Sequence, residues 1–145
     1  MRLKLIFFAV VVIPTVALAD ISKVEADRAA CLERAVANNE MKQCEFAASN
    51  QAEIELNKIY TEIKAELARG MKNRDPHIAA ENKEVNKRLL HSQHVWLAFR
   101  QANCSLAGVP MLGGTAEGLL MAGCISEATI ARVKELISVF SKEDI

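Results

Sequence analysis

The sequence predicts an all-α protein: a small antiparallel bundle of one short and three longer helices, stapled by two disulfides. Strong helix formers dominate residues 20–69, which contain no Gly and no Pro. Apolar residues then recur at steps of three and four along the later segments, and no run alternates β-branched with polar residues. The 145 residues are 51% apolar, enough for the core of one domain, and 18 basic residues balance 18 acidic ones. Without a basic excess, a nucleic-acid partner is not expected.

Residues 1–19 have the layout of a secretory signal peptide. Arg2 and Lys4 precede an apolar run over 5–13, and Ala17-Leu18-Ala19 offers small residues for cleavage. A membrane-spanning helix needs about 20 apolar residues, more than this run supplies. We therefore expect a domain over 20–145 that is periplasmic or secreted and has no membrane association after cleavage. Its 16 basic and 18 acidic residues leave a net charge of −2.

The first two helices are expected over 21–37 and 40–69. Asn38 and Asn39 separate them, and an asparagine is a favourable N-cap for the second. Gly70 stands where a C-terminal glycine is common. The buried stripe of the second helix is predicted to contain Leu56, Ile59, Tyr60, Ile63 and Leu67.

A third helix is expected over 77–103, with Asp75 as N-cap and Pro76 in the first turn. Its predicted inner row has 4-3-4-3 spacing and consists of Val85, Leu89, Ser92, Trp96 and Phe99.

Residues 104–114, rich in Gly and Pro, are expected to form a loop. Thr115 then caps a last helix that runs to about residue 140, with an apolar stripe of Ile130, Val133, Ile137 and Phe140.

Four cysteines, Cys31, Cys44, Cys104 and Cys124, lie in the exported part. An even count in an oxidising compartment indicates two disulfides, and no C-x-x-C pair favours a metal. Pairs close in the chain meet most easily, which favours Cys31–Cys44 with Cys104–Cys124. Antiparallel packing could also gather all four sulfurs at one end, so Cys44–Cys104 stays an alternative.

No catalytic constellation is present. His91 and His94 are three residues apart but fall opposite the predicted inner row, which indicates a solvated face rather than a metal site. No nucleophile motif or phosphate loop occurs. We expect no enzyme activity, no cofactor and no metal.

A polar set lies beside the predicted core. Asn57 and Tyr60 form one row of the second helix, and Gln93, Trp96 and Arg100 form one row of the third. A partly buried Arg needs acceptors. We interpret the set as a hydrogen-bonded brace between the two helices, in preference to a partner-binding site.

The spacing of these residues resembles the LprI-type lysozyme inhibitor family, small secreted bacterial proteins. The resemblance covers nearly the whole exported chain and rests on the segments Leu56-Asn57-x-x-Tyr60, Gln93-x-x-Trp96-Leu97-x-Phe99-Arg100-x-x-x-Cys104, Gly113-Gly114-Thr115 and Thr129-x-x-Arg132-x-x-x-Leu136. It implies a disulfide-bonded helical domain outside the cytoplasm that binds and inhibits lysozyme, and it adds Arg132 to the polar set.

The functional hypothesis is therefore an exported binding protein that occludes a lysozyme-like cell-wall hydrolase. The expected contact is the loop 105–114, with Val109, Met111 and Leu112 as exposed apolar anchors or, alternatively, as a plug on the bundle end. An immunity-type protein with a different target is the main alternative, and an enzyme with an unrecognised site is a remote one. The sequence specifies no oligomeric state.

Overall fold

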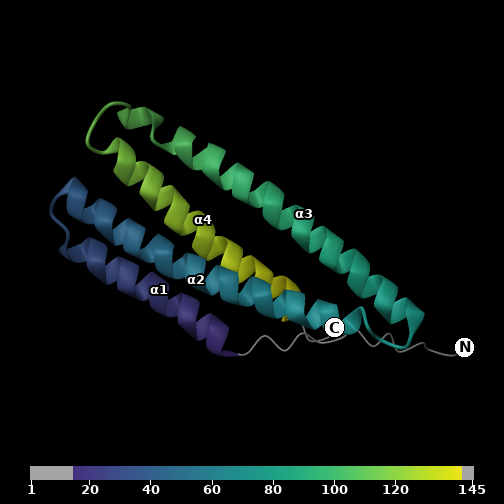
Figure 1. Ribbon diagram of the computed structural model, residues 1–145. Helices are drawn as coiled ribbons and strands as arrows, with labels where there is room; N and C mark the ends of the chain where they lie inside the picture. The colour runs from purple at the N-terminus through teal and green to yellow at the C-terminus, as the bar shows by residue number, and fades with distance from the viewer. Residues whose placement is uncertain (1–14, 142–145) are drawn as a thin grey trace, which may run out of the picture.

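The computed structural model describes residues 15–141, with side chains from residue 20, and this part of the chain is helical without strands. Four α-helices run antiparallel to their chain neighbours (Figure 1). Their bounds are α1 Thr15–Arg34, α2 Asn38–Gly70, α3 Pro76–Ala107 and α4 Glu117–Phe140, with a 3-10 turn η1 at Val109–Met111. The all-α prediction is confirmed. Most of the expected leader, residues 1–14, lies outside the described residues.

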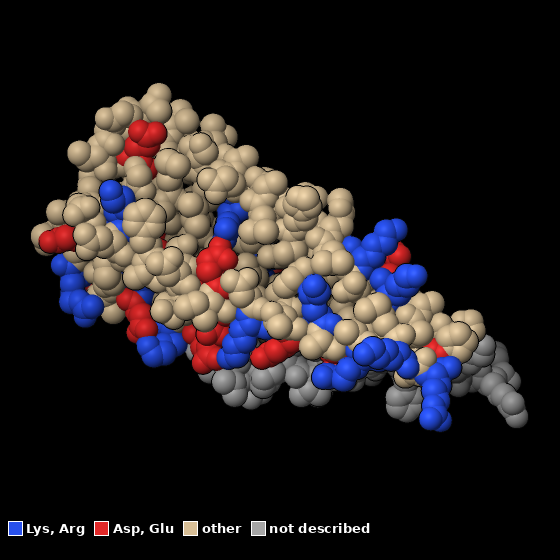
Figure 2. Space-filling view, in the orientation of Figure 1, with Lys and Arg blue, Asp and Glu red and all other residues tan. Residues whose placement is uncertain are grey.

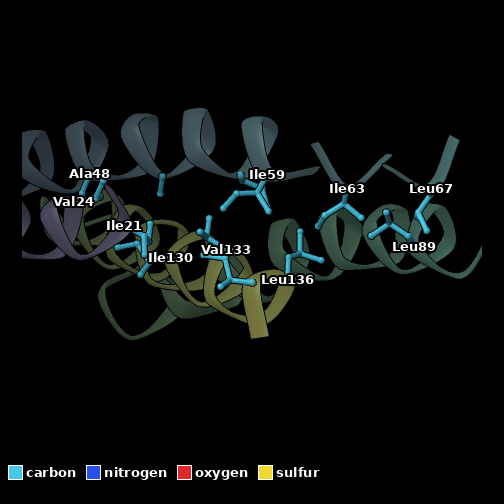
Figure 3. Close-up of a cluster of buried hydrophobic side chains, with 13 residues drawn as sticks. Ile21, Val24, Ala48, Ile59, Ile63, Leu67, Leu89, Ile130, Val133 and Leu136 are labelled. Atoms are coloured by element: carbon cyan, nitrogen blue, oxygen red, sulfur yellow. The ribbon is translucent and has the colours of Figure 1, made fainter. Parts of the chain in front are cut away.

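Helices α2 and α4 form the centre of the bundle. They pack most extensively against each other, and each also packs against α1 and α3, which lie apart on opposite sides of the bundle (Figure 1). Figure 3 shows that buried side chains from all four helices form one cluster along the bundle, among them Ile21 from α1, Ile63 from α2, Leu89 from α3 and Val133 from α4. Burial of this shared apolar surface is what drives the four helices together.

The predicted stripes of α2 and α4 are confirmed. Leu56, Ile59, Ile63 and Leu67 are buried and Tyr60 is half-buried against them. On α4, the members Ile130, Val133 and Ile137 are buried, and Phe140 packs against the same cluster.

The predicted inner row of α3 is wrong in two places. Leu89 is buried and Val85 and Trp96 are half-buried, but Ser92 is exposed and Phe99 is 62% exposed. The face that α3 turns inward instead contains Asn82, Leu89, Gln93, Trp96, Arg100 and Cys104. Gln93 and Arg100 can take these positions because α4 and α2 supply their hydrogen-bond partners, whereas Asn82 donates to the Ile78 carbonyl of its own helix.

Two predicted helix caps differ from the structure. Ala37, not an asparagine, is the N-cap of α2, and the Glu40 carboxylate accepts from the N–H groups of Val36 (2.8 Å) and Ala37 (3.3 Å). Thr115 does not cap α4, because its Oγ1 accepts from Asn38 Nδ2 at 3.3 Å and the helix begins at Glu117.

The Asp75 cap is confirmed. Its Oδ1 accepts from the His77 N–H at 2.8 Å, and Pro76 is the first residue of α3. The end of α3 was predicted four residues too early: the helix continues through Cys104 to Ala107, because Gly108 is the first helix breaker after Asn103.

Gly70 is the last residue of α2 and allows close approach of α3. Its φ is not positive, so the expected left-handed C-cap does not form. A Cβ at this position would lie 2.3 Å from Cγ of the buried Asn82, whose Nδ2 donates to the Ile78 carbonyl at 2.8 Å. The missing side chain is therefore a packing requirement.

The disulfides are Cys31–Cys44 and Cys104–Cys124, with Cα atoms 5.7 Å and 5.3 Å apart. The favoured pairing is confirmed and the Cys44–Cys104 alternative is wrong. Each bond joins consecutive helices next to their connection, α1 to α2 and α3 to α4. Both connections lie at the same end of the bundle (Figure 1).

Gly70→Ala should lower the free energy of unfolding by about 1–2 kcal/mol, because the new methyl group displaces the buried Asn82 side chain. Urea unfolding measures this. The matched control is Gly118→Ala inside α4, whose Cβ would meet only the flexible Lys42 Cδ at 3.4 Å. Gly118 is the second residue of α4, so this control should gain less than the roughly 0.5–1 kcal/mol expected in the middle of a helix. A higher free energy of unfolding for Gly70→Ala would contradict the packing requirement. So would an equal loss of stability when Gly70→Ala is introduced into the Asn82→Ala variant.

Replacing either cysteine pair by alanine should lower the free energy of unfolding by about 2–4 kcal/mol. The sequence separations are similar, 13 and 20 residues, so the chain-entropy model gives similar losses. Urea unfolding of each double variant, beside the oxidised wild type, provides the measurement. Unchanged stability in either variant would show that its disulfide does not constrain the unfolded chain.

Candidate functional site

Trp96 lies at the centre of a cluster of cationic and polar side chains between α2, α3 and α4. The Cζ atom of Arg100 is 4.8 Å from the centroid of the indole ring, and that of Arg132 is 5.6 Å from it. Trp96 also packs against the hydrophobic core. Both arginines are within cation–π range of the ring; the Arg132 contact attaches α4 to α3, and the Arg100 contact lies within α3.

Arg132 is 5% exposed, and its guanidinium bonds to two residues of α3 and one of α4. Its Nε donates to Gln93 Oε1 at 3.1 Å and its Nη2 donates to Ser92 Oγ at 2.7 Å. Its Nη1 donates to Glu135 Oε2 at 2.8 Å, which supplies the opposite charge. A buried guanidinium is tolerated only with such partners, so Arg132 fixes the register of α3 on α4.

Arg100 joins α3 to both α2 and α4. Its Nη1 donates to Glu53 on α2 and, at 2.7 Å, to Thr129 Oγ1 on α4. Thr129 is buried and its Oγ1 donates in turn to the Ile125 carbonyl at 2.7 Å. One side chain therefore bridges three helices.

The polar set predicted from the sequence is only partly brought together. Gln93, Trp96, Arg100 and Arg132 meet, but Arg100 does not bond to any of its expected partners. Tyr60 lies against the core with the Lys64 Nζ atom 5.7 Å from its ring centroid, and Asn57 is exposed. The partner of Arg100 that the sequence did not predict is Glu53, which lies one helical turn before Asn57 on α2. An acidic side chain facing the Arg100 row was the signal that could have identified it.

A second buried ion pair was also missed. Glu45 is 4% exposed and accepts from Arg28 Nε at 2.7 Å and Nη2 at 2.8 Å. The buried Ser126 hydroxyl donates to the same carboxylate, and Arg28 also donates to Glu127. The hydrogen bonds to Glu45 and then to Glu127 raise the pKa of Arg28 above its ordinary value despite partial burial, so it stays charged. This pair joins α1, α2 and α4 beside the Cys31–Cys44 bond.

The end of the bundle after α3 presents apolar side chains to solvent. Val109 and Met111 are each 51% exposed and Leu112 is 75% exposed. These exposed fractions favour the exposed anchors over the alternative of a plug on the bundle end. Gly113 has φ +76° and donates its N–H to Glu117 Oε2 at 2.8 Å, which turns the chain into α4. We call Val109, Met111 and Leu112 the apolar tip.

The surface around the apolar tip carries few charged side chains, one of them the Glu117 carboxylate that accepts from Gly113. Between residues 89 and 116 the sequence has one formally charged residue, Arg100, which points into the Trp96 cluster. In Figure 2 the end of the molecule around η1 and the adjoining part of α3 is largely tan apart from one acidic group, and most charged side chains lie along the α1 side and at the far end.

His77, His91 and His94 are all exposed. Among the described residues no group of three or more His, Cys, Asp or Glu is positioned to hold a metal. Within that same range, no helix is long and apolar enough to cross a membrane.

The model of a family described as "Lysozyme inhibitor LprI" matches residues 29–136. The chain belongs to the LprI family. The match spans α2 and α3 completely and includes the Trp96 cluster, the apolar tip and all four cysteines. The resemblance found in the sequence is thus confirmed, and the family is one of inhibitors rather than enzymes.

The chain is also similar to an uncharacterized protein, R02472, of Rhizobium meliloti (strain 1021). The two are 31% identical over 103 residues, which cover 71% of this chain and 73% of the relative. No solved structure matches the chain.

Arg100→Ala should lower the free energy of unfolding by about 1–3 kcal/mol, because Glu53 and Thr129 lose their donor and Trp96 loses a stacking partner. Thermal unfolding provides the measurement, with Arg100→Lys expected to recover only part of the loss. The control is Arg88→Ala, whose 78% exposed side chain pairs with Glu84 on the same helix and should change stability little. An unchanged melting temperature combined with lost partner binding would assign Arg100 to recognition instead.

Proposed function

We propose that this protein is exported and inhibits a lysozyme-like cell-wall hydrolase by inserting its apolar tip into the enzyme. Membership of the LprI family is the observation that carries the proposal, since it points to a lysozyme partner. Two disulfides suit an extracytoplasmic protein, and the leader expected over residues 1–19 would export the chain to where such enzymes act.

The apolar tip has the properties of an inhibitory contact. Binding energy concentrates in a few large side chains that become fully desolvated at the centre of an interface. Val109, Met111 and Leu112 lie in the α3–α4 connection, the longest between the described helices, and are at least half exposed. They suit a concave site on an enzyme, which a projecting tip would fill and thereby close to the polysaccharide.

The disulfide-bonded helices behind the apolar tip reduce the conformational entropy that is lost on binding. The Cys104–Cys124 bond ties α3 to α4 next to the connection, and Gly108 is buried against Met121. A connection held at both ends loses little conformational freedom when it binds.

The decisive assay follows the clearing of a bacterial wall suspension by lysozyme in the presence of excess oxidised protein. We expect slower clearing and no change in the protein itself, because an inhibitor acts by occlusion without turnover. Testing c-type and g-type lysozymes and wall hydrolases of the producing bacterium identifies the target class. No slowing of any of them would contradict inhibition and leave an exported protein with a different partner.

Leu112→Asp should weaken inhibition at least about tenfold, because a charge replaces an anchor that must be desolvated. Ile54→Asp is the matched control: its side chain is also exposed, 57%, but lies on α2. Both variants should keep the wild-type melting temperature. Equal inhibition by the two variants would place the contact elsewhere on the molecule.

A further inference from the structure

The outer face of α3 carries a regular apolar row that no described part of the chain covers. Val95, Phe99 and Leu106 are 53%, 62% and 66% exposed, and Ala102 between them is exposed as well. Their spacing is 4-3-4, which places all four on one face of a helix. We call these four residues the α3 seam. The same spacing occurs in helices that pack against a second helix along their length.

The seam is complementary to itself in the antiparallel direction. When two α3 helices pair about a twofold axis between residues 100 and 101, Val95 of each faces Leu106 of the other, and Phe99 faces Ala102. The largest side chain thus meets the smallest. Such alternation of large and small residues lets two helix surfaces interdigitate without voids.

The charge distribution of this surface also favours a second copy of the chain as the partner. A twofold contact brings each surface against its own copy, so a charged residue near the axis is repelled by its equivalent. Arg100 is the one formally charged residue between 89 and 116, and its guanidinium is turned inward to Glu53 and Thr129. A strongly charged partner would find no counter-charge on the seam, whereas a second copy needs none.

We propose that two copies of this protein associate through the α3 seam, with the two α3 helices antiparallel. The association is independent of the proposed inhibition. In this pairing, residues 109–112 of each copy lie outside the seam, level with residues 89–92 of the other copy's α3.

Sedimentation analysis of the exported, oxidised protein tests the proposal. At about 100 μM, where even a micromolar dimer is formed, the mass should be twice that of one chain. Phe99→Glu should raise the dissociation constant at least about tenfold, because it places two like charges at a desolvated contact. Ile54→Glu, exposed on α2, should leave the dimer intact. Both positions are exposed, and unchanged circular dichroism and melting temperature verify that the variants fold.

Paired charges test the register. Val95→Lys combined with Leu106→Glu puts opposite charges against each other in the antiparallel pair, so this double variant should still dimerise. Val95→Glu combined with Leu106→Glu puts like charges together and should give monomers. A monomeric wild type, a dimer unaffected by Phe99→Glu, or equal behaviour of the two double variants overturns the proposal.

Discussion

The attachment of α3 to the rest of the bundle depends on Trp96 and the two arginines that contact it. Only Leu89 among the apolar side chains of α3 is deeply buried, apart from the disulfide-bonded Cys104. Arg132 reaches from α4 to Gln93 and Ser92, and Arg100 reaches from α3 to Glu53 and Thr129. Hydrogen bonds and ring contacts are directional, unlike apolar packing, so they determine which face of α3 turns inward.

That constraint explains why so much apolar surface of α3 faces solvent. Because the inward positions are occupied by Gln93, Trp96 and Arg100, large apolar residues such as Val95 and Phe99 point away from the core. The seam proposed for a second copy thus arises from this choice of helix face. The apolar tip proposed for an enzyme lies in the connection that follows α3.

The predictable part of the fold is the part governed by local chemistry. The regular stripe of α2, the Asp75-Pro76 start of α3 and the disulfides between consecutive helices follow from spacing within a few turns of chain. The face of α3 could not be predicted in this way, because Phe99 and Arg100 fit the helical period about equally and hydrophobicity favours Phe99. Arg100 faces inward because it bonds to Glu53 and Thr129, which lie 47 and 29 residues away in the chain. The Arg28–Glu45 pair was likewise set by contacts between helices and gave no periodic signal.

Both disulfides lie at the end of the bundle that carries the apolar tip, whereas the α2–α3 connection at the opposite end has none. Among residues 15–141, no third helix accompanies the last turns of α2 and the first turns of α3 beyond the end of α4 (Figure 1). Opening fluctuations should therefore begin there and fade toward the cross-linked end, giving a gradient of amide protection along the bundle axis. Conformational fluctuations are then concentrated at the end remote from the apolar tip. A binding partner would meet a tip that is already ordered.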